Sequence, residues 1–290
     1  MIATGNSTGT FYFIGAGQAN ILDSKIADIT YSVEATTGTK ENLIFVSESP
    51  DVIGMSPLDY AYAAYVGDST MDFGDPMEDL RLIMTGHSTS VHFVVLNESS
   101  INSFHDIKGK KIGLPANTSG YYVALRLFAA YGITENDIEI VYVSTSEAGD
   151  ALKDGSIDLA VYSAGAPISS VTDLAMSKSI RLIGLEDSPE TDAFFAEYPY
   201  YKPSVIPGGT YSGVDDDSAC VNFPICLVVN DKLNDDIVYD IVKVLNENTT
   251  ELGKLHVLGN EWTTENTLMF YENPVIPFAD GAVRYYEEVK

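Results

Sequence analysis

The chain has 290 residues, of which 45% are hydrophobic, so it can bury a full core, and about two domains are expected. It carries 42 acidic and 16 basic side chains, a formal net charge of −26. Such a surface repels phosphate backbones, which excludes nucleic acid as a partner and disfavours anionic membranes. No apolar stretch reaches the roughly 18 residues of a bilayer span, and no basic segment followed by an apolar one opens the chain.

The two cysteines, Cys220 and Cys226, lie in a segment typical of a β-strand. Extended chain of that length spans roughly 20 Å, far beyond the reach of a disulfide. We therefore expect two buried free thiols. The four histidines lack the spacing of a zinc motif, so neither a metal site nor a cofactor is predicted.

The first part of the chain alternates apolar runs with helical patterns. A strand is expected at 10–14, before a Gly-Ala-Gly turn, and a helix after it because Ala19, Leu22 and Ile26 recur at helical spacing. The same alternation predicts further strands at 29–34, 51–55, 80–85 and 91–96. Helices are expected to open at 36–39 and after Pro57.

A second series of strands and helices begins near residue 110. Its strands are expected at 111–114, 138–143, 157–162 and 180–185, with helices after Gly120 and near 146–153 and 168–176. Residues 199–217, with three prolines, are expected to form a long connection. A strand at 219–229 and a long amphipathic helix at 236–255 follow. This alternation predicts an α/β protein with mostly parallel sheets, and the two series predict two lobes.

Three of the strand-to-helix loops share small residues, hydroxyl groups and glycine, with little charge: residues 9–17, 36–42 and 117–120. In such a loop, backbone N–H groups at a helix N-terminus can bind an anion, assisted by the helix dipole. Ligands of open α/β sheets sit beyond the carboxyl ends of the strands, where these loops lie. The same residues also suit ordinary helix capping, and convergence of loops from both lobes would favour a ligand site.

A second interpretation concerns residues 11–20, which nearly match the strand-GxGxxG-helix motif of dinucleotide enzymes. Glu34 falls where such enzymes place the acid that holds the ribose. Asn20, however, replaces the third glycine of the motif. The alternative function is therefore an NAD(P)-binding Rossmann-type oxidoreductase. No nucleophile motif accompanies it, and we predict no catalytic residues and no enzyme.

Eight blocks in a fixed order carry a family resemblance over nearly the whole chain. They are residues 3–5 with 9–12 and Gly15, 34–43, 91–95 with 101–110, 119–120, 162–167, 198–201, 206–211 and 281–286. In these blocks the chain resembles the TAXI family of solute-binding proteins, the extracytoplasmic receptors of one class of TRAP transporter. Phe13, Lys40 and Tyr121 depart from residues usual in the family, and Lys40 is the only cation in the three loops.

The resemblance implies a two-lobed periplasmic-binding-protein-like fold of type II, with a hinge of two antiparallel strands. Lobe I is expected at 1–92 and 219–290 and lobe II at 93–218, with the ligand cleft between them. The implied function is capture of a small carboxylate, an amino acid such as glutamate or an organic acid, and its delivery to a TRAP membrane subunit. The protein would be a periplasmic or cell-surface monomer whose export signal is absent from this sequence; a sensor that signals without transport is a further alternative.

The residues predicted to bind the ligand are those whose amides and hydroxyls would converge in the cleft. They are Thr10, Tyr12, Gly15, Glu34, Thr37, Gly38, Thr39, Asn42, Asn117, Thr118, Ser119, Gly120, Tyr162 and Gly165.

Several of these residues have a purely structural alternative. Tyr12 and Tyr162 could equally pack in the core, Asn42 could cap its own helix, and Glu34 could be a solvated carboxylate rather than a partner for a ligand ammonium group. None of the four arginines lies in these loops, so no bidentate clamp for a carboxylate is expected. His92, which alternates with apolar residues, is expected to be a hydrogen-bonded core histidine.

Overall fold

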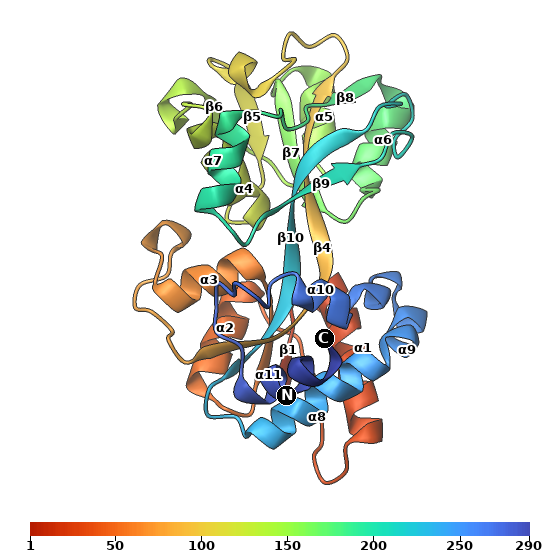
Figure 1. Cartoon of the computed structure of the whole chain (residues 1–290). Coiled ribbons are helices and arrows are strands. Elements are labelled where there is room, and N and C mark those ends of the chain that lie inside the picture. Colours follow the sequence, from red (N-terminus) through yellow and green to blue (C-terminus); the bar gives the residue numbers. More distant parts are fainter. The chain divides into compact units, whose positions relative to one another are not determined.

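The structure, a computed structural model, describes all 290 residues, which form two compact units (Figure 1). Unit 1 contains Met1–Ser88 and Pro224–Lys290, and unit 2 contains Thr89–Phe223. The chain passes from one unit to the other inside two long strands, β4 (Leu80–Leu96) and β10 (Ser218–Asn230). The unit boundaries thus fall after Ser88 and Phe223, where the sequence placed them after residues 92 and 218.

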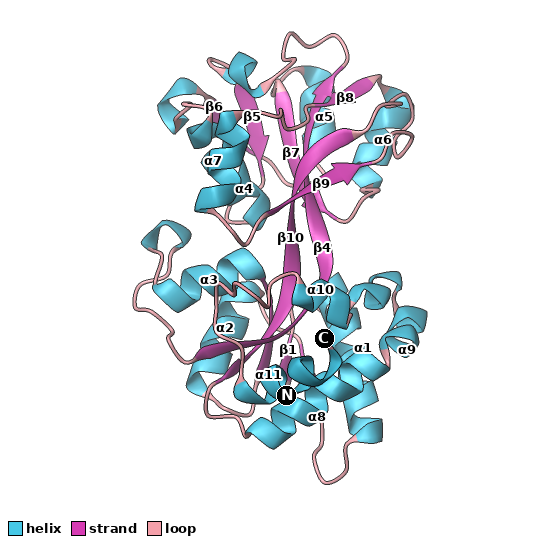
Figure 2. Ribbon diagram, in the orientation of Figure 1, coloured by secondary structure: helices cyan, strands magenta, loops and turns pink.

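Unit 1 has a sheet in the order β2-β1-β3-β10, in which β1 (Ile2–Ala3) pairs in parallel with β2 (Val33–Glu34) and β3 (Ile53–Pro57). The second half of β10 pairs antiparallel with β3, so that Val228 lies opposite Gly54. The helices of this unit are α1 (Thr10–Lys25), α2 (Thr39–Glu48), α3 (Leu58–Val66), α8 (Asp235–Glu247), α9 (Thr249–Leu255), α10 (Thr264–Leu268) and α11 (Asp280–Val289) (Figure 2). Two 3-10 turns, η1 (Ser69–Met71) and η4 (Val257–Glu261), complete it.

Unit 2 has the strand order β4-β7-β5-β6. Its strands are β5 (Lys111–Leu114), β6 (Glu139–Tyr142), β7 (Leu159–Ala164), β8 (Ile180–Leu182), which pairs with β4, and β9 (Lys202–Ile206), which pairs with β10. Its helices are α4 (Ser119–Ala130), α5 (Ala148–Asp154), α6 (Ser169–Ser177) and α7 (Pro189–Glu197), with 3-10 turns η2 (Phe104–Ile107) and η3 (Glu135–Asp137).

The sheets are mixed, which corrects the expectation of mostly parallel sheets. The strands β5, β6 and β7 are parallel to one another, whereas β4 pairs antiparallel with β7 and β8. The long strand β10 pairs antiparallel with both β3 and β9. The antiparallel pairs all involve β4 or β10, because these two strands carry the chain between the units.

The segment 10–14 is helical, so the expected strand there is wrong. Helix α1 begins at Thr10, and its buried residues Ile14, Gly17, Gln18, Ile21 and Leu22 follow helical spacing, while Phe13 is 53% exposed. A Cβ atom on Gly15 would lie 2.3 Å from Cγ2 of Thr4, so this glycine lets α1 pack closely on β1. The Gly-Ala-Gly sequence lies inside a helix and not in a strand-to-helix turn, which removes the structural context that the dinucleotide motif requires.

Residues 80–96, expected to form two strands, form the single strand β4. Gly86, in the middle of β4, lets the indole ring of Trp262 pack against the strand, because a Cβ atom at this position would lie 2.1 Å from that ring. The connection at 199–217 contains the strand β9, where Pro203 is accommodated because β9 pairs with β10 alone.

The helix expected at 236–255 is divided at Asn248 into α8 and α9. Helix α7 was not predicted, although its start carries a recognisable capping signal. Ser188 accepts a hydrogen bond from the Thr191 N–H, and Pro189 stands in the first turn. None of the helices is long and apolar enough to cross a bilayer.

Both cysteines lie in β10 as buried free thiols, which confirms that expectation. The Sγ of Cys226 donates to the Ser56 carbonyl at 3.2 Å. Residues Asp215–Asp217 of unit 2 are exposed, and the carboxylate of Asp217 accepts a hydrogen bond from the Gly208 N–H at 2.8 Å. No group of three or more His, Cys, Asp or Glu side chains is arranged to hold a metal ion.

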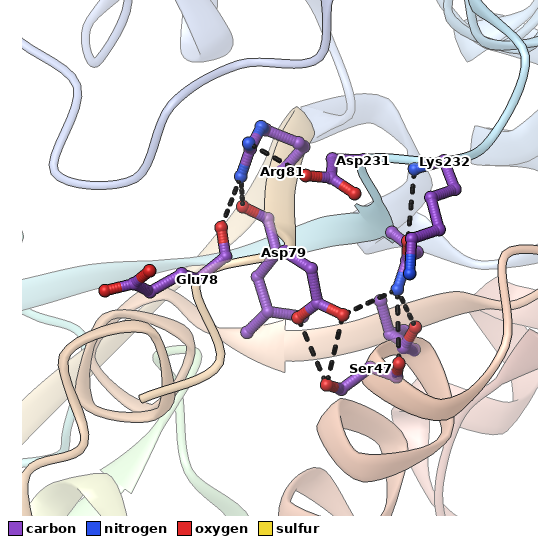
Figure 3. A network of polar contacts seen from close by, with 9 residues as sticks. Ser47, Glu78, Asp79, Arg81, Asp231 and Lys232 are labelled. Atoms are coloured by element: carbon purple, nitrogen blue, oxygen red, sulfur yellow. Dashed lines mark hydrogen bonds and ion pairs between the residues drawn. The ribbon is translucent and has the colours of Figure 1, made fainter. Parts of the chain in front are cut away.

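A polar network in unit 1 joins the end of α2 to the beginning of β4 and the end of β10 (Figure 3). Asp79 accepts from the Ser47 hydroxyl at 3.1 Å and from the Asn230 amide at 2.8 Å, and its own carbonyl accepts the Asp231 N–H. Arg81 extends the network with a 3.1 Å ion pair to Asp231. These contacts fix the unit 1 ends of both long strands, although Asp79 and Asn230 are 151 positions apart in the sequence.

Candidate functional site

The carboxyl ends of parallel strands are the usual ligand-binding edge of an α/β sheet. Unit 1 has such an edge where β1, β2 and β3 end, and unit 2 has one where β5, β6 and β7 end. Apart from Gly15 and Tyr162, the residues predicted from the sequence lie at the ends of these strands or in the loops and first helical turns that follow β1, β2, β5 and β7.

Asn42, in the first turns of α2, is fully buried beneath the unit 1 edge and connects its strands by hydrogen bonds. Its side-chain amide donates to the carbonyls of Thr4, after β1, and of Met55, in β3, the latter at 2.8 Å. Its Oδ1 accepts the Thr36 hydroxyl at 2.6 Å. The amide is therefore committed to the ends of the strands, and no part of Asn42 is accessible to a ligand.

The loop before α2 already holds an anion of its own. Oε2 of Glu41 accepts hydrogen bonds from the N–H and hydroxyl of Thr37, at 2.6 and 2.8 Å, and these bonds lower the pKa of Glu41. Gly38 has φ +132°, which a side chain would disfavour, and no atom lies within 4 Å of where its Cβ would be. Thr39, half-buried, is the first residue of α2.

Lys40 is tied to unit 1 itself. Its ammonium donates to the backbone carbonyl and the carboxylate of Asp72, and lies 5.5 Å from the centre of the Phe73 ring. The only cation of the three loops is thus paired within its own unit.

The start of α1 has no side-chain cap and no acidic residue in its first turn. Thr10 and Tyr12 are half-buried there, and Phe13, beside them, is exposed. At the end of β2, the Glu34 carbonyl accepts the Thr4 hydroxyl at 2.7 Å while the Glu34 side chain is exposed. The unit 1 edge therefore presents N–H groups at α1 and carboxylates at Glu34 and Glu41. Gly15 is buried against β1 and does not belong to this surface.

The unit 2 edge is built around the start of α4. Asn117 is exposed and adopts the left-handed conformation at φ 55°. Thr118 caps the helix, because its hydroxyl oxygen accepts the Tyr121 N–H at 3.3 Å and its hydroxyl donates to the Pro115 carbonyl at 2.8 Å. The first turn of α4 carries no acidic residue, so its N–H groups meet no competing carboxylate there.

Gly120 brings α4 against the end of β7. A Cβ atom on Gly120 would lie 2.6 Å from the Cβ of Ser163, which is too close for any side chain without movement. Ser119, next to Gly120, is 6% exposed. Gly165 is half-buried and is the first residue after β7. Ser163 is not among the residues predicted from the sequence. Its position, one residue before the carboxyl end of β7, is the signal that could have indicated it.

Tyr162 faces the core of unit 2 and not its edge. It is fully buried among Leu174, Ile206 and Tyr211, and its hydroxyl has no hydrogen-bond partner. Burial raises the pKa of this phenol to about 12. The sequence left open whether Tyr162 lines the ligand cleft or packs in the core, and the structure places its side chain in the core. Both faces of β7 are covered at this point, since Val161 is buried as well.

The two edges share the same kinds of polar group. They present helix N-termini, hydroxyl groups and few charges. The four arginines are engaged within their own units: Arg81 pairs with Asp231, Arg284 pairs with Asp236, Arg181 donates to the Ser99 carbonyl, and Arg126 of α4 donates to the Tyr201 hydroxyl. The two buried histidines, His87 and His92, lie within β4, and burial lowers the pKa of each to about 4.

The fold is that of the periplasmic solute-binding proteins. The chain resembles a structure of XAC2383 from Xanthomonas citri bound to ATP, with a TM-score of 0.61, 10% identity, and coverage of 100% of this chain and 99% of that one. It resembles the periplasmic aliphatic sulphonate-binding protein SsuA from Escherichia coli with a TM-score of 0.55, 13% identity, and coverage of 99% and 78%. A TctC solute-binding protein from Polaromonas matches with a TM-score of 0.55, 11% identity, and coverage of 99% and 94%.

The sequence itself matches a family model over residues 2–289. The chain belongs to the NMT1-like family.

Proposed function

We propose that the protein is an extracytoplasmic solute-binding receptor of a TAXI-type TRAP transporter that captures a small carboxylate. The observation that carries this proposal is the start of α4, where Thr118, Ser119 and Gly120 present a helix N-terminus free of acidic residues at the carboxyl edge of a parallel sheet. Family membership and the fold support a binding role.

The ligand class follows from the charges at the two edges. Backbone N–H groups at the start of α4 suit a carboxylate without an arginine. The exposed Glu34 and the Glu41 carboxylate at the unit 1 edge suit an ammonium group. An amino acid such as glutamate meets both requirements, and an organic acid meets the first. SsuA, which shares the fold, is a binder of aliphatic sulphonates, also organic anions.

The proposed mechanism is closure of two lobes on the ligand, with β4 and β10 as the hinge. It is supported by the route of the chain, which changes units twice and each time within a continuous strand. The loops of both units would then contribute to one site, and opening would release the ligand to a membrane subunit. Function as a monomer outside the cytoplasm belongs to the same proposal.

Mass spectrometry of the natively purified protein, denatured immediately before injection, identifies a co-purified ligand. In parallel, L-glutamate, 2-oxoglutarate and NAD are tested for a rise in melting temperature, which a ligand of the folded state produces by mass action. We expect a shift with a carboxylate and none with NAD. A rise in melting temperature with NAD would contradict the proposal. So would the absence of any rise across a panel of amino and organic acids.

The α4 site is tested with Ser119→Ala. Loss of one hydrogen bond to a charged group costs about 1–2 kcal/mol, which corresponds to roughly 5- to 30-fold weaker binding. Ser177→Ala, at the end of α6, removes a hydroxyl that bonds only to its own helix and is the matched control. Calorimetry with the identified carboxylate measures both, and equal affinities in the two variants would place the ligand elsewhere.

A further inference from the structure

Three groups of unit 2 form a buried polar chain around the phenol of Tyr211. The Tyr211 hydroxyl lies 2.9 Å from Nε2 of His92 in β4 and 2.9 Å from the backbone N of Ile168. Nδ1 of His92 lies 3.2 Å from the Ser90 carbonyl. His92 and Tyr211 are each 1% exposed, and Ile168 is 6% exposed.

The hydrogen atoms of this chain can be assigned from its partners. The Ile168 N–H can only donate, so the Tyr211 oxygen accepts there and the Tyr211 hydroxyl donates to Nε2 of His92. Nδ1 of His92 then carries the proton and donates to the Ser90 carbonyl. Every polar atom of the chain is satisfied with a neutral imidazole, and burial lowers the pKa of His92 to about 4, so the imidazole stays neutral at pH 7.

Ile168 closes the loop that follows β7. Residues 165–167 connect the end of β7 to α6, whose N-cap is Ile168 and which has no side-chain cap of its own. At the other end of the loop, Ser163 contacts the position where a Gly120 side chain would be, at the start of α4. The Tyr211 phenol thus supplies the bond that holds the far end of the same strand-end loop.

The segments on both sides of Tyr211 are held by hydrogen bonds and close backbone contacts. The Gly209 N–H donates to the Val214 carbonyl at 2.7 Å, and the Gly208 N–H donates to Asp217. Gly208 passes so close to Asp215 that a Cβ atom would lie 2.1 Å from the carbonyl oxygen. A phenylalanine at 211 would fill the same space but leave two buried polar groups, on Ile168 and His92, without a partner.

We infer that Tyr211, braced by His92, is a positioning residue that fixes the conformation of the loop at residues 165–167 for ligand binding. Its effect on affinity rests on the proposed function, while its hold on the loop does not. Tyr211 acts through Ile168 and does not contact the ligand, since its side chain is enclosed in the core of unit 2.

The test compares Tyr211→Phe with Tyr131→Phe. Tyr131 is also a buried tyrosine of unit 2, 6% exposed, and its hydroxyl bonds to Thr191 at 2.8 Å at the opposite end of α4. Amide hydrogen exchange of ligand-free protein is followed in peptides covering residues 163–172. We expect at least tenfold faster exchange there in Tyr211→Phe and no change in Tyr131→Phe. Unchanged exchange in Tyr211→Phe would overturn the inference.

Affinity for L-glutamate and 2-oxoglutarate is then measured by calorimetry. We expect about tenfold weaker binding in Tyr211→Phe and wild-type affinity in Tyr131→Phe; equal affinities would overturn the role in binding. If no carboxylate of the panel described above binds the wild type, the proposed ligand class fails, and the exchange result alone decides whether Tyr211 holds the loop. If Tyr211→Phe does not fold, the variants His92→Leu and His92→Gln replace it. We expect faster exchange of residues 163–172 in His92→Leu. We expect a smaller increase in His92→Gln, because the glutamine carbonyl can accept the hydrogen bond from the Tyr211 hydroxyl.

Discussion

At the scale of single residues, the decisive property is whether a polar group is already satisfied inside its own unit. Asn42 looks from the sequence like either a ligand residue or a helix cap, and it is neither. Its three hydrogen bonds connect the loops after β1 and β2 to β3. The residue shapes the unit 1 edge without being part of its surface.

Replacement of Asn42 by alanine should lower the free energy of unfolding by about 3 kcal/mol, because two buried carbonyls and a hydroxyl lose their partner. Asn20→Ala, at an exposed position of α1, should change it by less than about 0.5 kcal/mol. Urea unfolding followed by circular dichroism measures both. Full stability of Asn42→Ala together with lost ligand binding would show that Asn42 acts on the ligand instead.

Gly120, one of the residues predicted to bind the ligand, has no room for a side chain. The clash is with Ser163 of the same unit. Gly120→Ala should therefore destabilise the protein by about 1–3 kcal/mol. The double variant Gly120→Ala/Ser163→Gly should recover at least about 1 kcal/mol of that loss. A thermodynamic cycle from chemical unfolding of the four proteins measures the coupling, and additive effects would contradict the contact.

At the scale of the elements, the two long strands are fixed in unit 1 by contacts distant in sequence. The Asp79 carboxylate receives Ser47 from α2 and Asn230 from β10 (Figure 3). Trp262 lies against Gly86 of β4, and Thr85 exchanges hydrogen bonds with Thr267 of α10. The segment of β4 within unit 1 is thereby held from two sides.

Asp79→Ala should cost about 2 kcal/mol of unfolding free energy, because a charged acceptor is removed from two partly buried donors. Asp75→Ala, an exposed carboxylate in the preceding loop, serves as the control and should be close to neutral. By contrast, breaking the exposed Arg81–Asp231 pair with Asp231→Ala should cost no more than about 1 kcal/mol. Thermal and urea unfolding would refute this ranking if Asp231→Ala were the most harmful variant.

At the scale of the whole molecule, charge and buried histidines set the response to pH. The formal charge of −26 opposes compaction at neutral pH, and acidification relieves that repulsion. His87 and His92 act in the other direction. Burial lowers the pKa of both from 6.5 to about 4, with His256 adding to the effect on His87. The unfolded chain therefore takes up their protons first, and stability falls as pH decreases from about 6.5 to 4.

The His92 contribution is isolated by His92→Gln, which keeps an acceptor for Tyr211. Between pH 7 and 4 the wild type should lose about 3 kcal/mol more than the variant, the equivalent of a pKa lowered from 6.5 to about 4. Urea unfolding at pH 7, 6, 5 and 4 gives this difference directly, and the common effect of surface carboxylates cancels. Parallel pH profiles for the two proteins would show that His92 is not held neutral by burial.

The sequence by itself determined the class of fold, the two buried thiols and the loops that begin α2 and α4. These features depend on local patterns: the spacing of apolar residues, and Thr or Ser with glycine before a helix. β5 lies at 111–114 in both the pattern and the structure for that reason. The resemblance over eight blocks extended this to the solute-binding fold.

Only the tertiary structure decided which polar side chains are available to a ligand. Asn42 and Tyr162, both predicted to bind the ligand, are buried, because their surroundings come from Thr4 and the α5–α6 core, and Lys40 is paired with Asp72. The same is true of α1, which is a helix where its apolar run suggested a strand, since its glycines fit it against β1 and α9. Burial and hydrogen-bond partners depend on residues far along the chain, and a local pattern contains no information about them.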